Sequence, residues 1–378
     1  MPPRTVGRYE VLSVIGRGGV GTVYRARHRE TGERVAVKLL GPPPACDPGA
    51  ARRLAREFEA LHGLSHPNVI RVFEAGVQEG YSYLVMELVE GLDLRSYLSP
   101  ALDDVGEPGD LSGGPSGGSD LEPWTDEPAT ESFSIVDDPS FCDARGTGGD
   151  ERSFDGGGPE AIRAFADLME EPETDPGMQP SSGDARAGAS RPAADGPRPL
   201  SRAMLAHLNQ PRRVERLRDA MVQVCGALAY VHRRGLVHRD LKPSNIMVDD
   251  LRRVRLMDFG LVKLASDEAN RAGHPHQHVV GTYRYMSPEQ ARGDRVDHRA
   301  DLYSLGVVLY ELLCARPPFF APRPSDLWEA ITARPPAAAS ALNPGVDPAL
   351  AYVAERLLAK HPRERFQSAE EVAAAIAR

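Results

Sequence analysis

Alternating apolar and polar positions over the first 40 residues predict an antiparallel β-meander. Strand-like runs at 11–15, 22–26 and 34–40 are separated by a glycine-rich stretch at 16–21 and a Thr-Gly-Glu turn at 31–33. The chain therefore opens with a small β-rich unit.

A helix and two further strands complete this predicted unit. Three consecutive prolines end the meander, and helical periodicity then runs from about 49 to 64. Strand-like runs at 69–74 and 81–89 follow, and a short helix is expected near 92–98. Residues 1–90 should thus form a lobe of antiparallel strands with one main helix.

The second predicted lobe is mostly helical. It begins at 91–99 and, after an insert, resumes at 212–378. Apolar residues at helical spacing, followed by a glycine stop, predict its first long helix: Val214, Leu217, Met221, Val224, Leu228, Val231 and then Gly235. Two short strand-like runs, 246–248 and 254–257, flank a turn at 249–252. We therefore expect an α+β protein of two lobes.

The insert between these parts, residues 100–211, differs in composition. Positions 101–200 hold 23 Asp and Glu, six Arg and no Lys, a net charge of −17, so the other 278 residues carry +8 of the total −9. Apolar residues are too sparse to offset the entropy of ordering, so we expect mostly disorder, with at most a transient helix at 160–171. The role of the insert is left open, and recruitment of an unidentified partner is one interpretation.

Composition argues against several classes of protein. The 278 residues outside 101–200 are mildly basic, but they contain no stripe of basic residues interleaved with aromatic ones. No nucleic-acid partner is therefore expected. The cysteines, Cys46, Cys142, Cys225 and Cys314, show no disulfide or zinc spacing. There is no apolar signal core and no apolar run near the roughly 18 residues that a membrane span needs. We expect a cytoplasmic protein with free thiols and no membrane span.

The glycine-rich stretch bridges two antiparallel strands. A dinucleotide-binding fold would need a helix directly after it, and a Walker loop would need a Gly-Lys-Ser/Thr ending, and both are missing. One interpretation is a lid over phosphate groups, since glycines let backbone N–H groups approach oxygen atoms. The other is an ordinary glycine-rich hairpin.

Ionisable residues in the two lobes suggest more specific chemistry. Lys38 lies in an apolar strand, and Glu57, on the inward face of the following helix, is its expected partner. In the second lobe, pairing across the turn at 249–252 is expected to bring Asn245 opposite Asp258. Two oxygen ligands would then meet at one end of a hairpin, as in Mg²⁺ sites shared with a nucleotide.

The same hairpin is preceded by a candidate base. Asp240 lies five residues before Asn245 and could accept the proton of a hydroxyl group, while Lys242 could neutralise a phosphoryl group in transfer. A polar turn between buried strands would not explain so many ionisable groups.

Taken together, five motifs resemble those of the protein kinases in order and approximate spacing. They are Gly16-x-Gly18-x-x-Gly21-x-Val23, Val-Ala-Val-Lys38, His238-Arg-Asp240-Leu-Lys-Pro-Ser-Asn245, Asp258-Phe-Gly260 and Ser287-Pro-Glu289. The resemblance covers 1–99 and 212–378. Lys242 and the stretch 281–290 look like those of bacterial, eukaryotic-like serine/threonine kinases, which implies the two-lobed kinase fold.

The resemblance implies an ATP site at the start of the chain. The glycine loop would cover the phosphates, and Lys38, held by Glu57, would contact the α- and β-phosphates. The residues expected around the rest of the nucleotide are Val23, Ala36 and Met247 at adenine, Met86 as gatekeeper, the backbone of Glu87 and Val89 at the adenine edge, and Asp93 at the ribose.

It also implies catalytic and structural roles. Asp240 would orient or deprotonate the substrate hydroxyl, Thr282 would bond Asp240 and Lys242, and Asn245 and Asp258 would hold Mg²⁺, with Mn²⁺ as an alternative ion. Glu289 would pair with Arg365, Asp301 would brace the backbone of the catalytic loop, and His238 would pack in the core. The implied activity is transfer of the ATP γ-phosphoryl group to serine or threonine of protein substrates in bacterial signalling.

Two competing functions remain. A pseudokinase scaffold would usually lack Lys38, Asp240, Asn245 or Asp258, and all four are present. A small-molecule kinase is disfavoured by the intact stretch 281–290, where the resemblance places docking of protein substrates.

Overall fold

The computed structural model describes most of the two predicted lobes. The described residues are 3–18, 21–40, 58, 61–78, 81–99, 199–259, 280–321 and 323–378. Glu57, Gly260 and residues 100–198 of the predicted insert lie outside them, as do Cys46 and Cys142.

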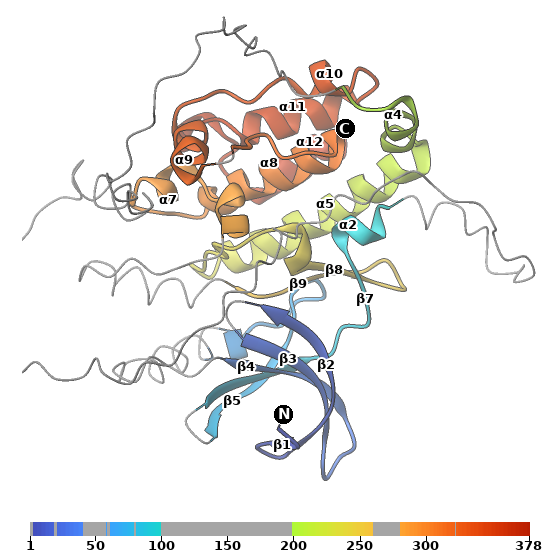
Figure 1. Ribbon diagram of the computed structural model, residues 1–378, viewed down its shortest axis with the longest axis vertical. Helices are drawn as coiled ribbons and strands as arrows, with labels where there is room; N and C mark the ends of the chain where they lie inside the picture. Colours follow the sequence, from blue (N-terminus) through green and yellow to red (C-terminus); the bar gives the residue numbers. More distant parts are fainter. Residues whose placement is uncertain are drawn as a thin grey trace, which may run out of the picture. The chain divides into compact units, whose positions relative to one another are not determined.

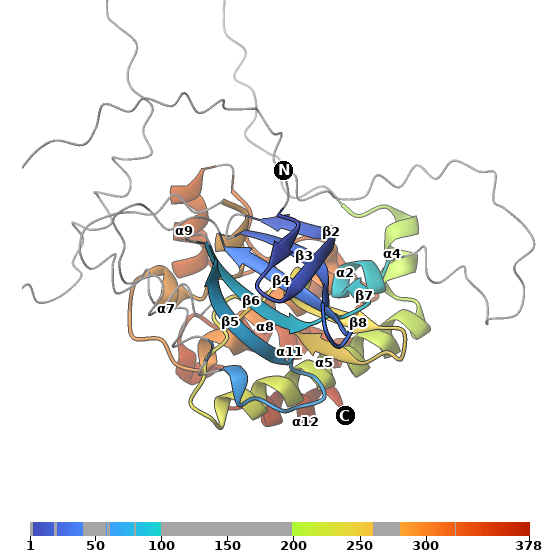
Figure 2. The same cartoon turned by 90° about the horizontal axis from the view of Figure 1, so that it is seen from below.

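A six-stranded antiparallel sheet forms the N-terminal lobe (Figure 1). Its strands are β1 (Thr5–Val6), β2 (Tyr9–Gly18), β3 (Gly21–His28), β4 (Arg34–Leu40), β5 (Val72–Gln78) and β6 (Tyr81–Glu87), in the spatial order β1-β2-β3-β4-β6-β5. Figure 2 shows the last five side by side. Alternate side chains point inward, so Ala26, Val37 and Val85 are fully buried. The predicted meander is confirmed.

Strand β5 begins later than predicted. The apolar run at 69–74 suggested a strand, but residues before Val72 are bound elsewhere. Val69 forms a parallel bridge with Leu256, and Ile70 N donates a hydrogen bond to Leu256 O at 3.0 Å. A long-range partner therefore takes the first part of the predicted strand.

A second sheet of three short strands follows the first lobe. It contains β7 (Gly91–Asp93), β8 (Ile246–Asp249) and β9 (Val254–Leu256) in that order. Only Leu94–Tyr97 of the helix predicted near 92–98 is helical (α2), and Asp93 caps its N-terminus. Position 91 requires glycine, because a Cβ atom there would lie 2.2 Å from Val248 O.

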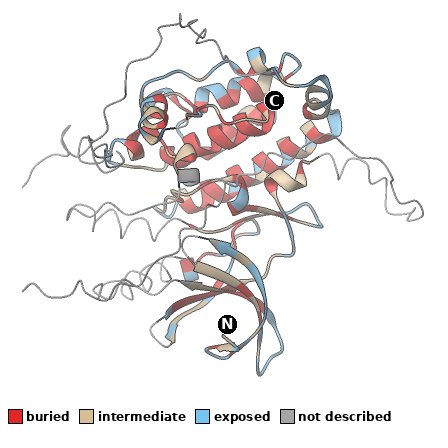
Figure 3. Cartoon of the chain, viewed as in Figure 1, coloured by how far each residue is buried: buried red, intermediate tan, exposed pale blue. Residues whose placement is uncertain are grey.

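The C-terminal lobe is helical, as predicted. Its elements are α4 (Arg202–Leu208), α5 (Pro211–His232), η2 (Pro243–Asn245), η3 (Val280–Tyr285), α7 (Pro288–Ala291), α8 (Arg299–Cys314), α9 (Pro324–Thr332), α10 (Ala339–Leu342), α11 (Pro348–Leu357), η4 (Pro362–Glu364) and α12 (Ala369–Ile376). Figure 3 shows α8 and the inner face of α5 as largely buried. Cys225 and Cys314 are buried free thiols, as expected.

Helix α4 corrects the predicted end of the insert. Residues 199–211 were assigned to the insert, but Ser201 caps α4 by accepting a hydrogen bond from Met204 N, and Leu208 is buried. A helix of only seven residues gave a weak signal next to the Gly- and Pro-rich stretch, although five of the seven are apolar. The cap and the apolar side chains at its end would have identified it.

Arg213 joins the two described chain ends that flank residues 100–198. Its guanidinium is buried and donates to Leu98 O at 3.1 Å and to Leu208 O at 3.1 Å. His207 Nε2 also lies 3.2 Å from Leu98 O. The chain therefore leaves and re-enters this lobe at one fixed place.

Removing the insert should leave the fold intact. Replacing 102–197 with a short Gly/Ser linker shortens the connection between two chain ends that are already held together. We expect the free energy of unfolding to rise by about 1–2 kcal/mol, since each halving of the length of a flexible connection is worth roughly 0.6 kcal/mol. Urea denaturation measures this change. A matched deletion of 102–211 also removes α4 and should destabilise the lobe. A shorter deletion that fails to fold would contradict the prediction.

Candidate active site

Lys38 of the first lobe and Asp258 of the second form an ion pair. Lys38 lies on β4, paired with Val23 of β3 and Leu84 of β6, and its Nζ is 2.9 Å from Asp258 Oδ1. Its side chain is 17% exposed and that of Asp258 36%, so the pair is shielded from water only in part. The sequence had suggested Glu57 as the partner of Lys38, and that contact lies outside the described residues.

A second group of polar side chains surrounds Asp240. Lys242 Nζ lies 3.3 Å from Asp240 Oδ2. Asn245 Nδ2 donates to Asp240 O at 2.8 Å and to Asp240 Oδ2 at 3.3 Å. The three side chains therefore lie together, with the Asp240 carboxylate between a cation and a carboxamide, and their catalytic roles stay predictions.

Asp301, at the start of α8, fixes the backbone before Asp240. Its carboxylate accepts hydrogen bonds from His238 N and Arg239 N, both at 2.8 Å, and from His232 Nε2 at 2.8 Å. Burial alone would raise the pKa of Asp301, but these donors outweigh it and lower the pKa below its usual value. The expected brace is confirmed. It holds Arg239 at a φ of 65°, which is unfavourable for a residue with a side chain.

His232, which the sequence analysis missed, completes this brace. It occupies the last turn of α5. A histidine just before a glycine helix stop was the available signal, but nothing local indicated that it would meet an aspartate 69 positions away.

His238 has a structural environment, as expected. It is fully buried, and its ring lies 4.6 Å from that of Phe259. Burial lowers its pKa. Asp240 N donates to Nδ1, so the neutral ring carries its proton on Nε2 and donates to Met257 O at 2.9 Å.

One predicted register is wrong by one residue. Strands β8 and β9 pair Ile246 with Leu256, and Met257 N donates to Asn245 O at 2.9 Å. Met257, not Asp258, is thus opposite Asn245. The turn has three residues and ends at Arg252 with a φ of 59°, a left-handed position that the sequence did not signal. Asp258 follows with a φ of 50°.

The expected nucleotide residues come from both sheets. Ala36 and Met86 are neighbours on β4 and β6 and are buried, while Val23 is half-buried. Asp93 is opposite Met247 in the second sheet. In the glycine loop, Gly16 pairs with Val23 and Gly18 with Gly21. The nucleotide roles of all these residues stay predictions, and the side chain of Thr282 is outside the described part.

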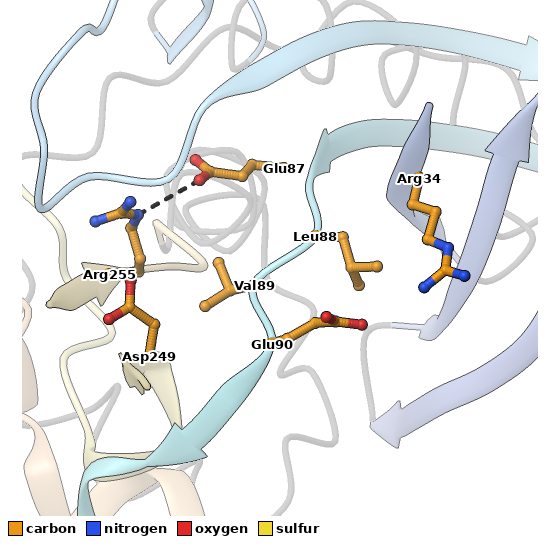
Figure 4. A pocket seen from close by; sticks show the side chains of 7 residues that line it. All are labelled: Arg34, Glu87, Leu88, Val89, Glu90, Asp249 and Arg255. Carbon is orange, nitrogen blue, oxygen red and sulfur yellow. Dashed lines mark hydrogen bonds and ion pairs between the residues drawn. The ribbon is translucent and has the colours of Figure 1, made fainter. Parts of the chain in front are cut away.

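A cavity of about 260 Å³ lies beside the segment that joins the lobes (Figure 4). It is lined by Arg34, Glu87, Leu88, Val89, Glu90, Asp249 and Arg255. Arg255 Nε is 3.5 Å from Glu87 Oε1 across it. Glu87 and Val89, expected at the adenine edge, line this cavity, whereas Val23, Ala36 and Met247 do not, so it overlaps the expected adenine site only in part.

A buried ion pair supports the segment after η3. Arg365 donates to both oxygens of Glu289, with distances of 2.7 and 2.8 Å, and neither residue is more than 4% exposed. Glu289 lies on α7, whose N-terminus carries a Ser287–Gln290 capping box. The Glu289–Arg365 pairing implied by the motifs is confirmed.

A network that the sequence analysis did not predict joins α2, η3 and α8. Tyr285 OH donates to Glu311 Oε2 at 2.7 Å, and Arg95 pairs with Glu311. Ser304 Oγ donates to Tyr285 O at 2.7 Å. These contacts connect the helix capped by Asp93 to the stretch 281–290.

The lobes and this site define the protein kinases, and the chain belongs to that family. The model for the family described as protein tyrosine and serine/threonine kinase matches residues 9–370. The predicted two-lobed kinase fold is therefore confirmed. A likeness to the crystal structure of the Mycobacterium tuberculosis PknI kinase domain agrees, with a TM-score of 0.53, 23% identity and coverage of 99% of this chain and 96% of that chain.

Two curated bacterial relatives are similar over almost the whole chain. The chain is 29% identical to the probable serine/threonine-protein kinase SCO3848 of Streptomyces coelicolor, covering 98% of this chain and 40% of the relative. It is 27% identical to the serine/threonine-protein kinase PknB of Mycobacterium tuberculosis, covering 100% of this chain and 44% of the relative. The chain thus spans less than half of the length of these relatives. Among the helices that the structure describes, none has the length and apolar character to cross a membrane.

Proposed function

We propose that the chain is an ATP-dependent kinase that phosphorylates serine and threonine residues of protein substrates in bacterial signalling. The Lys38–Asp258 contact carries this proposal, because it joins a lysine of one lobe to a carboxylate of the other. In phosphoryl transfer such a lysine binds the α- and β-phosphates and such an aspartate binds the metal ion. The similarity to two bacterial serine/threonine kinases supports the choice of substrate.

The residues around Asp240 would perform the transfer. Its carboxylate would orient the substrate hydroxyl and accept its proton as the hydroxyl oxygen bonds to the γ-phosphorus of ATP. The bond from that phosphorus to the bridging oxygen breaks in the same transfer, and ADP leaves. Lys242, 3.3 Å from that carboxylate, would neutralise negative charge on the transferring group. The Asp301 brace would keep Asp240 in position during the reaction.

Asn245 and Asp258 suit a divalent ion in their donor chemistry. Mg²⁺ prefers oxygen ligands and is commonly held by one or two carboxylates together with substrate phosphates. Asn245 uses Nδ2 to bind Asp240, which leaves its amide oxygen for another partner. The described residues contain no group of three or more His, Cys, Asp or Glu arranged for a metal, so ATP would complete the site. A bound Mg²⁺ or Mn²⁺ would supply charge neutralisation on the phosphates.

Incubation with labelled ATP and Mg²⁺ tests the proposal. We expect label on serine or threonine of the chain or of a protein substrate, and no label with Asp240→Asn, which keeps the size of the side chain and loses the base. Nucleotide binding without transfer would indicate a pseudokinase scaffold. Transfer only to small molecules would indicate the other competing function.

We further expect activity without phosphorylation of residues 267–280, of which 267–279 lie outside the described part. In related kinases a phosphothreonine before the Gly-Thr pair neutralises the catalytic-loop arginine, here Arg239. This stretch has three histidines, at 274, 276 and 278, and no Ser, Thr or Tyr, and the preceding hydroxyl residue is Ser266. Histidine cannot supply the negative charge. Phosphatase treatment should therefore leave peptide phosphorylation unchanged. A large loss that ATP restores in the wild type, but not in Ser266→Ala, would refute this.

A further inference from the structure

The segment just before β5 binds the outer edge of β9. Leu256 N donates to Asn68 O at 2.9 Å, and Ile70 N donates to Leu256 O at 3.0 Å. The other edge of β9 pairs with β8. Strand β9 is thus held on one side by the C-terminal lobe and on the other by a segment that leads into the N-terminal sheet.

Two side chains reinforce this junction. Asn68 Nδ2 donates to Val254 O at 2.9 Å and to Gln223 Oε1 at 2.8 Å. Gln223 Oε1 also accepts from Val254 N at 2.9 Å, while its Nε2 donates to Arg252 O and Asp219 Oδ2, both at 2.9 Å. Both polar groups of the Val254 backbone are therefore bound by this amide pair.

Strand β9 leads directly to the Lys38–Asp258 contact. Asp258 follows Leu256 by two residues and has a φ of 50°, a left-handed conformation that is uncommon for a residue with a side chain. Its partner Lys38 is on β4 of the other lobe. The direction of the Asp258 carboxylate thus depends on how firmly β9 is held.

We propose that Asn68 and Gln223 are positioning residues for phosphoryl transfer, acting through the backbone of β9 to hold Asp258 against Lys38. This inference rests on the proposed function. It extends the set of residues required by the reaction to two amides that bind β9, one on the segment before β5 and one on α5. Misplacement of a reacting group by 1 Å can lower a rate about 100-fold, so small shifts of β9 matter.

The test compares Gln223→Met and Asn68→Ala with wild-type protein. The side chain of methionine has about the same length as that of glutamine but lacks the amide group that makes these hydrogen bonds. For each variant we expect the Mg²⁺ concentration for half-maximal binding of a fluorescent ATP analogue to rise about tenfold, and the transfer rate to fall by a similar factor. In the nucleotide-free protein, hydrogen exchange at Val254 N and Leu256 N should become faster. The double variant should resemble the single ones, because both residues act in one network.

Two controls separate positioning from general stability. Glu215→Gln changes an exposed residue on the same helix and should have no effect. The double variant Gln223→Glu with Asp219→Asn keeps the acceptor for Asn68 and Val254 and exchanges donor and acceptor within the helix, but it loses the donor to Arg252 O, so it should recover only part of the Mg²⁺ response.

The possible results are distinct. The inference would be overturned if the variants melt at a lower temperature but, while folded, need no more Mg²⁺ than the wild type and react as fast. Wild-type protein that binds Mg²⁺ and nucleotide but transfers nothing would refute the proposed function, while the binding assay would still test Asn68 and Gln223. Wild-type protein that binds no nucleotide would overturn both.

Discussion

Asp258→Asn and Lys38→Met should each lower the rate of phosphoryl transfer by at least about 100- to 1,000-fold, the usual effect of removing one charged or donor group aimed at the reacting centre. The asparagine loses the charge that would hold a metal ion. The methionine loses the cation that lies 2.9 Å from Asp258 and would contact phosphates. Because the two side chains form one pair, the double variant should be little worse than either single one.

The measurement is steady-state transfer of label to a peptide, with the melting temperature followed in parallel. Asp250→Asn makes the same chemical change at an exposed residue of the nearby turn and should keep full activity. Near-normal transfer by Asp258→Asn or Lys38→Met would contradict the kinase assignment. Loss of activity together with loss of cooperative unfolding would instead indicate a damaged fold.

The second large effect should be on stability. Arg365→Met should lower the free energy of unfolding by about 3–5 kcal/mol, because it leaves the Glu289 carboxylate buried without its cation. The same change removes hydrogen bonds from the guanidinium to Ala359 O at 2.8 Å and Arg299 O at 2.9 Å.

Denaturant unfolding of matched variants checks this expectation. Arg233 and Glu370 also form an ion pair, but their side chains are 62% and 54% exposed, so Arg233→Ala should cost only about 0–1 kcal/mol. Adding Glu289→Leu to Arg365→Met should recover part of the loss, since no buried charge then remains unpaired. Equal losses of unfolding free energy in Arg365→Met and Arg233→Ala would show that burial does not determine how much these ion pairs stabilise the fold.

Local patterns predicted the elements that depend on local order. The strand at Arg34–Leu40 has the predicted bounds, and α5 matches the predicted helix closely, because alternation and 3.6-residue spacing each report which side faces the core. The same patterns failed where distant segments compete. Val69 pairs with Leu256, from a strand far along the chain, and so is not part of β5.

The sequence predicted which residues form the candidate site better than it predicted how they are arranged. The motifs identified Asp240, Lys242 and Asn245, which the structure brings together. The prediction that Asn245 lies opposite Asp258 was wrong, because the left-handed conformation of Arg252 shifts the register of the β8–β9 hairpin by one residue. No local pattern signals that conformation in an arginine, nor that His232 would reach Asp301.

Because Arg213 holds the two described chain ends together, we expect residues 100–198 to be replaceable. Since Arg213 binds both Leu98 O and Leu208 O, the kinase lobe does not depend on the intervening chain to bring its own parts together. The entropic cost of joining the two chain ends grows only with the logarithm of the length of the chain between them. Doubling that length therefore adds about 0.6 kcal/mol to the cost. A folded reporter domain with neighbouring termini could stand in this position and leave both lobes unchanged.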